Sequence, residues 1–230
     1  RRLGEKIQDD GMTEPTDRPP AAAAPVAAAI EVALPGLPTL RGQRWGEGEP
    51  VAVLLHEPGT DLDAWGSLPA LLARRLEAAV DALDLPGHGL SDDPWLPARL
   101  PEAVAAITRR WAAAGGAPAI IAAGDTAWAA LTQAAALGPA AVVALSPAGI
   151  DPGALASARS PLVPKLIFAG ALDGDAVATA RQAANALGGW AAVSSVPTAE
   201  RGTAILAGRW GESVADHIAG FLREAIVRRR

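Results

Sequence analysis

The sequence predicts an α/β fold, with a doubly wound, mostly parallel sheet and an antiparallel hairpin at its N-terminal edge. Short apolar runs alternate with segments of helical spacing along most of the chain, the pattern of a sheet covered by helices on both faces. Residues 51–85 contain a strand, a helix and a second strand, an order that requires a right-handed crossover between parallel strands. With 230 residues and 50% hydrophobic content, the chain is large enough for one core. We expect a flexible Ala/Pro-rich arm over residues 1–29 and one domain over residues 30–230.

The first half of the domain is expected to contain an edge hairpin, two buried strands, a helix and a loop. Residues 30–45 predict the hairpin, because two short apolar strands flank a turn that is rich in proline. A buried strand at 51–55, a helix at 67–76 and a buried strand at 79–85 follow. The glycines and prolines of residues 86–94 then predict a loop.

The second half continues the alternation. The segment 101–116 begins with proline and ends with glycine, as helices commonly do. The remaining expected elements are strands at 118–124, 140–147, 165–170 and 190–196, and helices at 126–138, 175–189 and 211–227.

Composition excludes several classes of function. The net charge is −5 and no basic run is longer than the short arginine clusters at the two ends, so nucleic acid is not an expected partner. The absence of cysteine excludes disulfides and thiol nucleophiles. No apolar run reaches the roughly 18 residues of a membrane span, and the Ala-rich segment 21–30 is interrupted by Pro25, so we interpret it as a linker. A soluble, cytoplasmic protein is the default expectation.

No metal or cofactor site is predicted. The acidic residues Asp81, Asp92 and Asp93 are not accompanied by His or Cys at metal-ligand spacing. We therefore expect these three carboxylates to be solvated.

Two loop motifs resemble those of the α/β-hydrolase family. In that family one strand ends in His-Gly and forms the oxyanion loop, and the next parallel strand ends in Asp-x-Pro-Gly-His-Gly-x-Ser. This chain has His56-Glu57-Pro58-Gly59 at the first place, and residues 84–91 read DLPGHGLS at the second. The resemblance implies the family's core topology over residues 30–227. It implies a core without a cap, because the interval between Pro147 and Lys165 is too short for the helical cap that many relatives insert there. His56 and His88 match positions that tie loops together in the family.

The resemblance places Asp125 at the nucleophile position. The family's strand-to-helix turn reads small-x-nucleophile-x-small, and residues 123–127 match it with Asp125 at the centre. Placing Thr126 there instead would put Trp128 where a small residue is needed. An aspartate nucleophile implies chemistry like that of dehalogenases and epoxide hydrolases, in which a histidine activates the water that hydrolyses the ester. The alternative is a structural role, in which Asp125 caps the helix that follows.

The other two positions of the implied triad are Asp173 for the acid and Arg201 for the histidine. Arginine stays protonated at ordinary pH, so it cannot act as a general base. Asp125, Asp173 and Arg201 together resemble an ion cluster more than a proton relay, because a guanidinium suits carboxylates.

The oxyanion loop departs from the family as well. Glu57 replaces the usual glycine, and Pro58 occupies the position of an amide donor although proline has no N–H. The donor that remains is the amide of Thr126, and the loss of one donor typically lowers the rate ~10²–10³-fold.

These substitutions predict a member of the α/β-hydrolase family with a degraded triad that serves as a non-catalytic binding or structural subunit. The alternative is an active hydrolase of the ester, epoxide or haloalkane type that uses Asp125 as nucleophile. The expected partner is a small apolar ligand, or a protein bound through the N-terminal arm.

Overall fold

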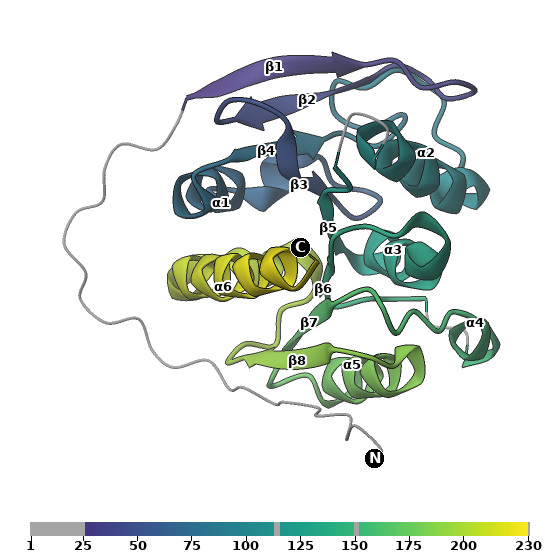
Figure 1. Cartoon of the computed structure of the whole chain (residues 1–230), viewed down its shortest axis with the longest axis vertical. Helices are drawn as coiled ribbons and strands as arrows, with labels where there is room; N and C mark the ends of the chain where they lie inside the picture. The colour runs from purple at the N-terminus through teal and green to yellow at the C-terminus, as the bar shows by residue number, and fades with distance from the viewer. Residues whose placement is uncertain (1–25, 113–115, 150–151, 230) are drawn as a thin grey trace.

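The computed structural model describes residues 26–112, 116–149 and 152–229. Over these residues the strands form one sheet in the order β1-β2-β4-β3-β5-β6-β7-β8 (Figure 1). β1 pairs with β2 and β2 with β4 in antiparallel fashion, and all other neighbours are parallel. The strands are β1 (Ala27–Val32), β2 (Leu40–Trp45), β3 (Pro50–Leu55), β4 (Ala79–Leu83), β5 (Ala119–Ala123), β6 (Val142–Leu145), β7 (Lys165–Gly170) and β8 (Ala191–Val196).

Helices cover both faces of the sheet, as the alternating pattern predicted. α1 (Leu68–Leu76) and α6 (Gly211–Arg229) lie on one face. The opposite face, to the right in Figure 1, carries α2 (Leu100–Ala112), α3 (Gly124–Leu137) and α5 (Gly174–Leu187). The short α4 (Pro152–Ser157) packs against α5. Four short 3-10 helices complete the described elements: η1 (Leu62–Trp65), η2 (Pro97–Arg99), η3 (Gly202–Leu206) and η4 (Gly208–Trp210).

The core consists of two apolar layers, one on each side of the sheet. Along β3, Val53 and Leu55 belong to the layer under α2, α3 and α5, whereas Ala52 and Leu54 belong to the layer under α1 and α6. This alternation follows from the two-residue period of a strand. Strands buried on both faces read as continuous apolar runs, which is why they were recognisable in the sequence.

The edge hairpin is confirmed, with Ala27 opposite Trp45 and Val32 opposite Leu40. β1 begins at Ala27, three residues before the expected start of the domain at residue 30. The rest of the expected arm, residues 1–25, lies outside the described residues.

Asp81 is not solvated, so that expectation is wrong. Its side chain is fully buried in β4, and both carboxylate oxygens accept hydrogen bonds from Arg44 of β2, at 2.7 Å from Nε and 2.8 Å from the terminal nitrogen. The antiparallel pairing of β2 with β4 places Arg44 opposite Asp81. A bidentate guanidinium is what makes a carboxylate tolerable in the interior.

Lys165, the first residue of β7, is also fully buried. Its ammonium donates to the carbonyls of Ser160, Val163 and Gly188 at 2.6, 2.7 and 2.9 Å. Burial lowers the pKa of Lys165 to about 8. The side chain therefore joins two turns at the edge of the sheet opposite the loops described below.

Candidate functional site

The carboxyl ends of the parallel strands converge at one edge of the sheet. β3 lies between β4 and β5 in the sheet. The chain passes from β3 to β4 on one side and then to β5 on the other side of β3, so the strand order reverses at β3. Ligands of open α/β sheets bind at such switch points. The segments that directly follow β3, β5, β7 and β8 carry all of the predicted site residues, and Asp125 and Thr126 lie in the first turn of α3.

The two histidines of the motifs join these loops, as predicted. His56 is fully buried; its Nε2 accepts from the Leu85 amide at 2.9 Å, so Nδ1 carries the proton and donates to the Glu57 carbonyl at 2.9 Å. Burial lowers the pKa of His56 below its usual value. His88 accepts from the Gly59 amide at 3.1 Å and donates to the Pro86 carbonyl at 2.9 Å. Both imidazoles are therefore used in holding the loops.

Asp84 organises the loop that begins with it. Its buried carboxylate accepts from the amides of Leu62 and Leu90 at 2.8 and 2.9 Å. The hydroxyl of Ser91 donates to the Asp84 carbonyl at 2.8 Å. The family motif after β4 thus has a structural role in this chain.

The turn from β5 into α3 is built on Gly124. Its φ is +54°, a value that side chains other than glycine rarely adopt, and a sharp, strained turn at this place is where the family holds its nucleophile. The expected residue, Asp125, lies one position farther on, exposed in the first turn of α3. It is not a helix cap either, because α3 begins at Gly124 and its N-cap is Ala123. The residue at the strained turn therefore has no side chain.

The carboxylate of Glu57 occupies the space beside this turn. A Cβ on Gly124 would lie 3.0 Å from Glu57 Oε2, and a Cβ on Gly202 would overlap the same oxygen. Glu57 Oε1 accepts from the amide and the hydroxyl of Thr203 at 3.2 and 2.9 Å. Glu57 thus lies between the β5 turn and the loop after β8, where a nucleophile and a base would meet.

Asp173 and Arg201 are brought together. Arg201 Nε donates to Asp173 Oδ2, with side chains that are 62% and 14% exposed. Asp173 also caps α5 by accepting from the Ala176 amide at 3.1 Å. The Arg201 hydrogen bond holds the pKa of Asp173 below its usual value, and Asp173 in turn raises the pKa of Arg201. The pair is fixed in its charged form, which keeps Arg201 from acting as a base.

Asp125 joins neither member of that pair among the described residues. A Cβ built on Gly149 would lie 3.1 Å from Asp125 Oδ1, so the Asp125 carboxylate lies beside the loop after β6. Thr126 is fully buried and its hydroxyl donates to the His56 carbonyl at 2.8 Å. The oxyanion donor was expected to be the backbone amide that follows the nucleophile position. Because Gly124 occupies the turn, that amide is the one of Asp125 and not the one of Thr126.

The residues that sequence reasoning missed are Gly124, Gly202 and Thr203. One signal was present: Gly124 is the residue of the 123–127 motif most able to adopt a positive φ. Because glycine has no side chain that could attack a substrate, the sequence alone offered no reason to place Gly124 in the site. Nothing in the sequence pattern indicates that Glu57 reaches Thr203, because the two lie 146 positions apart.

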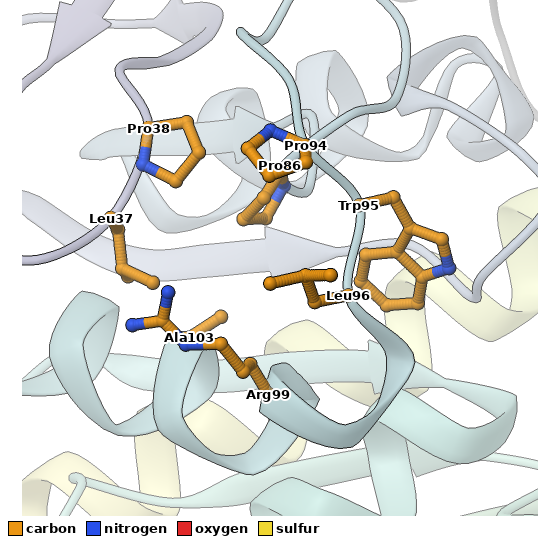
Figure 2. A pocket seen from close by; sticks show the side chains of 8 residues that line it. All are labelled: Leu37, Pro38, Pro86, Pro94, Trp95, Leu96, Arg99 and Ala103. Carbon is orange, nitrogen blue, oxygen red and sulfur yellow. The ribbon is translucent and has the colours of Figure 1, made fainter.

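A groove of about 480 Å³ opens beside Glu57, between the loop after β3 and the segment after β8. Its described lining residues are Glu57, Thr60, Asp63, Ala64, Trp65, Gly66, Ser67, Leu68, Thr203, Ala204, Leu206, Ala207 and Gly211. A much smaller apolar pocket of about 20 Å³ lies elsewhere, between the Pro86 loop and the start of α2 (Figure 2). It shares no lining residue with the groove.

Within the described residues, no group of three or more His, Cys, Asp or Glu side chains is arranged to hold a metal ion. The helices of the described residues also include none with the length and hydropathy needed to cross a membrane.

No family model and no curated protein matches this sequence. Solved structures match its fold. A protein described as a predicted CIB-like hydrolase from Thermoplasma acidophilum has a TM-score of 0.68 at 15% identity, covering 86% of this chain and 99% of its own. A loop variant of a haloalkane dehalogenase from Bradyrhizobium elkanii has a TM-score of 0.67 at 16% identity, covering 88% and 98%. An esterase from Pyrococcus furiosus has a TM-score of 0.67 at 12% identity, covering 93% and 97%. At these identities the likeness concerns the fold, and the chain has the α/β-hydrolase fold.

Proposed function

We propose that this chain is a non-catalytic ligand-binding or structural protein built on the α/β-hydrolase fold. The observation that carries the proposal is the pairing of Gly124 with Glu57. The turn that would present a nucleophile has no side chain, and a carboxylate lies against it.

The residues of the site do not suit acyl transfer, which needs a general base and hydrogen-bond donors for the oxyanion. The protonated Arg201, paired with Asp173, cannot accept a proton from water or a hydroxyl. Pro58 has no amide to donate. Negative charge that develops at a substrate oxygen near Gly124 would meet the Glu57 carboxylate, whereas catalysis needs donors at that place.

The competing function is a hydrolase that uses Asp125 as nucleophile. In its favour, the Asp125 side chain is exposed at the N-terminal turn of α3, beside the same edge of the sheet. Against it, the loop after β8 contains no histidine to activate water: His56 and His88 hold the loops after β3 and β4, and His217 lies in α6, where its Nδ1 is 3.1 Å from Ser194 Oγ of β8.

Turnover assays separate the two functions. The purified protein is tested against aryl esters, epoxides and haloalkanes, together with Asp125→Ala and the matched variant Asp175→Ala, which removes an exposed aspartate from the first turn of α5. We expect no turnover above the buffer rate for any of the three proteins. Turnover that Asp125→Ala abolishes and Asp175→Ala leaves intact would contradict the non-catalytic function.

If the chain is a structural protein, the N-terminal arm serves as a tether to a protein partner. Deletion of residues 12–25 spares β1, which begins at Ala27. We expect a stoichiometric partner to co-purify with the full chain and to be lost with this deletion. A full-length chain that purifies as a monomer would count against the tether.

A further inference from the structure

The first strand, β1, forms an edge of the sheet that is open to solvent. It pairs with β2 on one side, and no other strand of the described residues pairs with its outer side. Figure 1 shows it as the outermost strand, at the top of the sheet. Four of its six residues are exposed, whereas β8 at the opposite edge has four buried residues and no exposed one. β1 therefore presents a row of backbone donors and acceptors to solvent.

β1 also lacks the features that protect edge strands from pairing with other chains. Lysine, proline and β-bulges serve this purpose in natural proteins. The sequence of β1 is AAAIEV, and its pairing with β2 runs from Ala27 to Val32 without a register shift. Its one charged residue is Glu31, whose Oε2 already lies 3.6 Å from Nε of Arg41 in β2. This edge is thus suited to accept another strand.

The apolar residues of β1 are complementary to a second copy of the same strand. In an antiparallel pair, residues that face each other have their side chains on the same face of the sheet. With a two-fold axis at Ala29, Val26 faces Val32 of the second copy, and Ala28 faces Ile30. Val26 is 91% exposed, more than any other large apolar side chain of the described residues. The pairing would cover it.

The charge of β1 selects the same position for the axis. With the axis at Ala29, Glu31 faces Ala27 of the second copy. An axis at Glu31 would instead place two carboxylates opposite each other, which is unfavourable. The axis at Ala29 also lets all residues from 26 to 32 take part in the pairing.

The N-terminal arm of the same chain is a poorer occupant of this edge. Proline has no N–H to donate to a neighbouring strand. The arm has prolines at positions 15, 19, 20 and 25, so the stretch closest to β1 lacks several of the donors that a strand needs.

We propose that β1 pairs with β1 of a second copy of this chain across a two-fold axis at Ala29, so that two sheets join at this edge. The surface lies apart from the groove beside Glu57, and the inference does not depend on the proposed function. Because only a short strand from each copy takes part, the interface is small and the dimer is weak, with a dissociation constant on the order of 10⁻⁵–10⁻⁴ M.

Sedimentation velocity of the full chain, at concentrations up to about 500 µM, tests for this dimer. We expect Ala29→Glu to weaken it at least about fivefold, because the new carboxylate faces its own copy and lies diagonally across from Glu31 of the second copy. The matched variant Ala135→Glu adds the same charge at an exposed alanine of α3 and should change the affinity less than about twofold.

A mixture of two variants tests the position of the axis. Ala29→Lys and Ala29→Glu carry opposite charges that face each other only when one copy of each meets at an axis through residue 29. We expect the mixture to associate at least as strongly as the parent. This recovery also shows that the loss in Ala29→Glu alone does not come from misfolding.

Cross-linking gives a second measure of the register, because the chain has no cysteine of its own. In Ala29→Cys the two thiols face each other, with Cβ atoms about 5 Å apart, which is close to what a disulfide needs. In the matched variant Ala27→Cys, on the same face of the strand, the two thiols are offset by about 13 Å along the strands. With oxidised glutathione as the oxidant, we expect Ala29→Cys to form disulfide-linked dimers at least about tenfold faster.

The inference is overturned if the full chain stays monomeric over the whole concentration range, if Ala29→Glu dimerises like the parent, if the mixture shows no recovery, or if the two cysteine variants cross-link at the same rate. A chain that lacks residues 1–25 keeps β1 and should dimerise as the full chain does. Dimers that form only after this deletion would mean that the arm occupies the edge, which also overturns the inference. None of these outcomes bears on the turnover assays.

Discussion

At the scale of single residues, Gly202 and Glu57 constrain one another. Gly202 has a φ of +54°, and a Cβ there would overlap Glu57 Oε2. Gly202→Ala should therefore lower the free energy of unfolding by about 2–4 kcal/mol, part of it from the strained backbone and part from the overlap. Gly208→Ala is the control, since its φ is +70° and nothing lies within 4 Å of its Cβ position.

Chemical denaturation of the double variant Gly202→Ala with Glu57→Ala separates the two parts. We expect the double variant to recover the part due to overlap, which gives a coupling energy above about 1 kcal/mol. Additive losses, or a Gly202→Ala loss no larger than that of Gly208→Ala, would show that Glu57 does not occupy this space.

His56 makes stability depend on pH. Burial holds its folded-state pKa below the value of about 6.5 that it has in the unfolded chain. The unfolded chain therefore binds the proton more readily, so the contribution is fully present above about pH 6.5 and is lost as the pH falls through the folded-state pKa. We expect the parent to lose more stability than His56→Gln between about pH 7.5 and pH 5. Equal losses in the two proteins, measured by urea denaturation, would contradict this assignment.

At the scale of elements, β7 depends on a charge at its first residue. Lys165 donates to three carbonyls in two turns, and Lys165→Met removes this donor from all of them. The Ser160 carbonyl keeps the Val163 amide at 3.1 Å, whereas the carbonyls of Val163 and Gly188 lose the donor described here. We expect this variant to lose roughly 3 kcal/mol of unfolding free energy. Lys165→Gln, which keeps two donors, should lose less. Thermal or urea denaturation decides, and a Lys165→Met protein as stable as the parent would show that the carbonyls find other partners.

The elements of this fold could be predicted because most of their signals are local. Buried strands such as β5 read as apolar runs, and the glycines and prolines beside them mark the loops. The predictions that were wrong depended on a contact between distant segments or on a backbone angle. Asp81 reads as a surface carboxylate until the pairing of β2 with β4 brings Arg44 to it. The helix expected to begin at Thr126 begins at Gly124, because glycine permits the turn to occur two residues earlier.

At the scale of the whole molecule, the α/β-hydrolase fold is complete, and the Glu57 carboxylate lies beside the turn at Gly124. The sheet order, the two helical layers and the loops held by His56 and His88 are all in place. Asp173 is already positioned against residue 201. The scaffold should therefore accept catalytic residues at the positions that the geometry identifies.

The triple variant Gly124→Ser, Glu57→Gly and Arg201→His tests this separation of fold and site. Serine at the strained turn would face the space that Glu57 vacates, and histidine at position 201 would lie next to Asp173, the order of groups that nucleophilic catalysis requires. We expect measurable aryl ester hydrolysis from the triple variant. Gly124→Ser alone should remain inactive, because the Glu57 carboxylate and a protonated Arg201 persist. Adding Asp173→Asn to the triple variant should reduce the rate, since the histidine loses the group that orients it. A folded triple variant no faster than the parent would mean that Gly124 does not hold the nucleophile position.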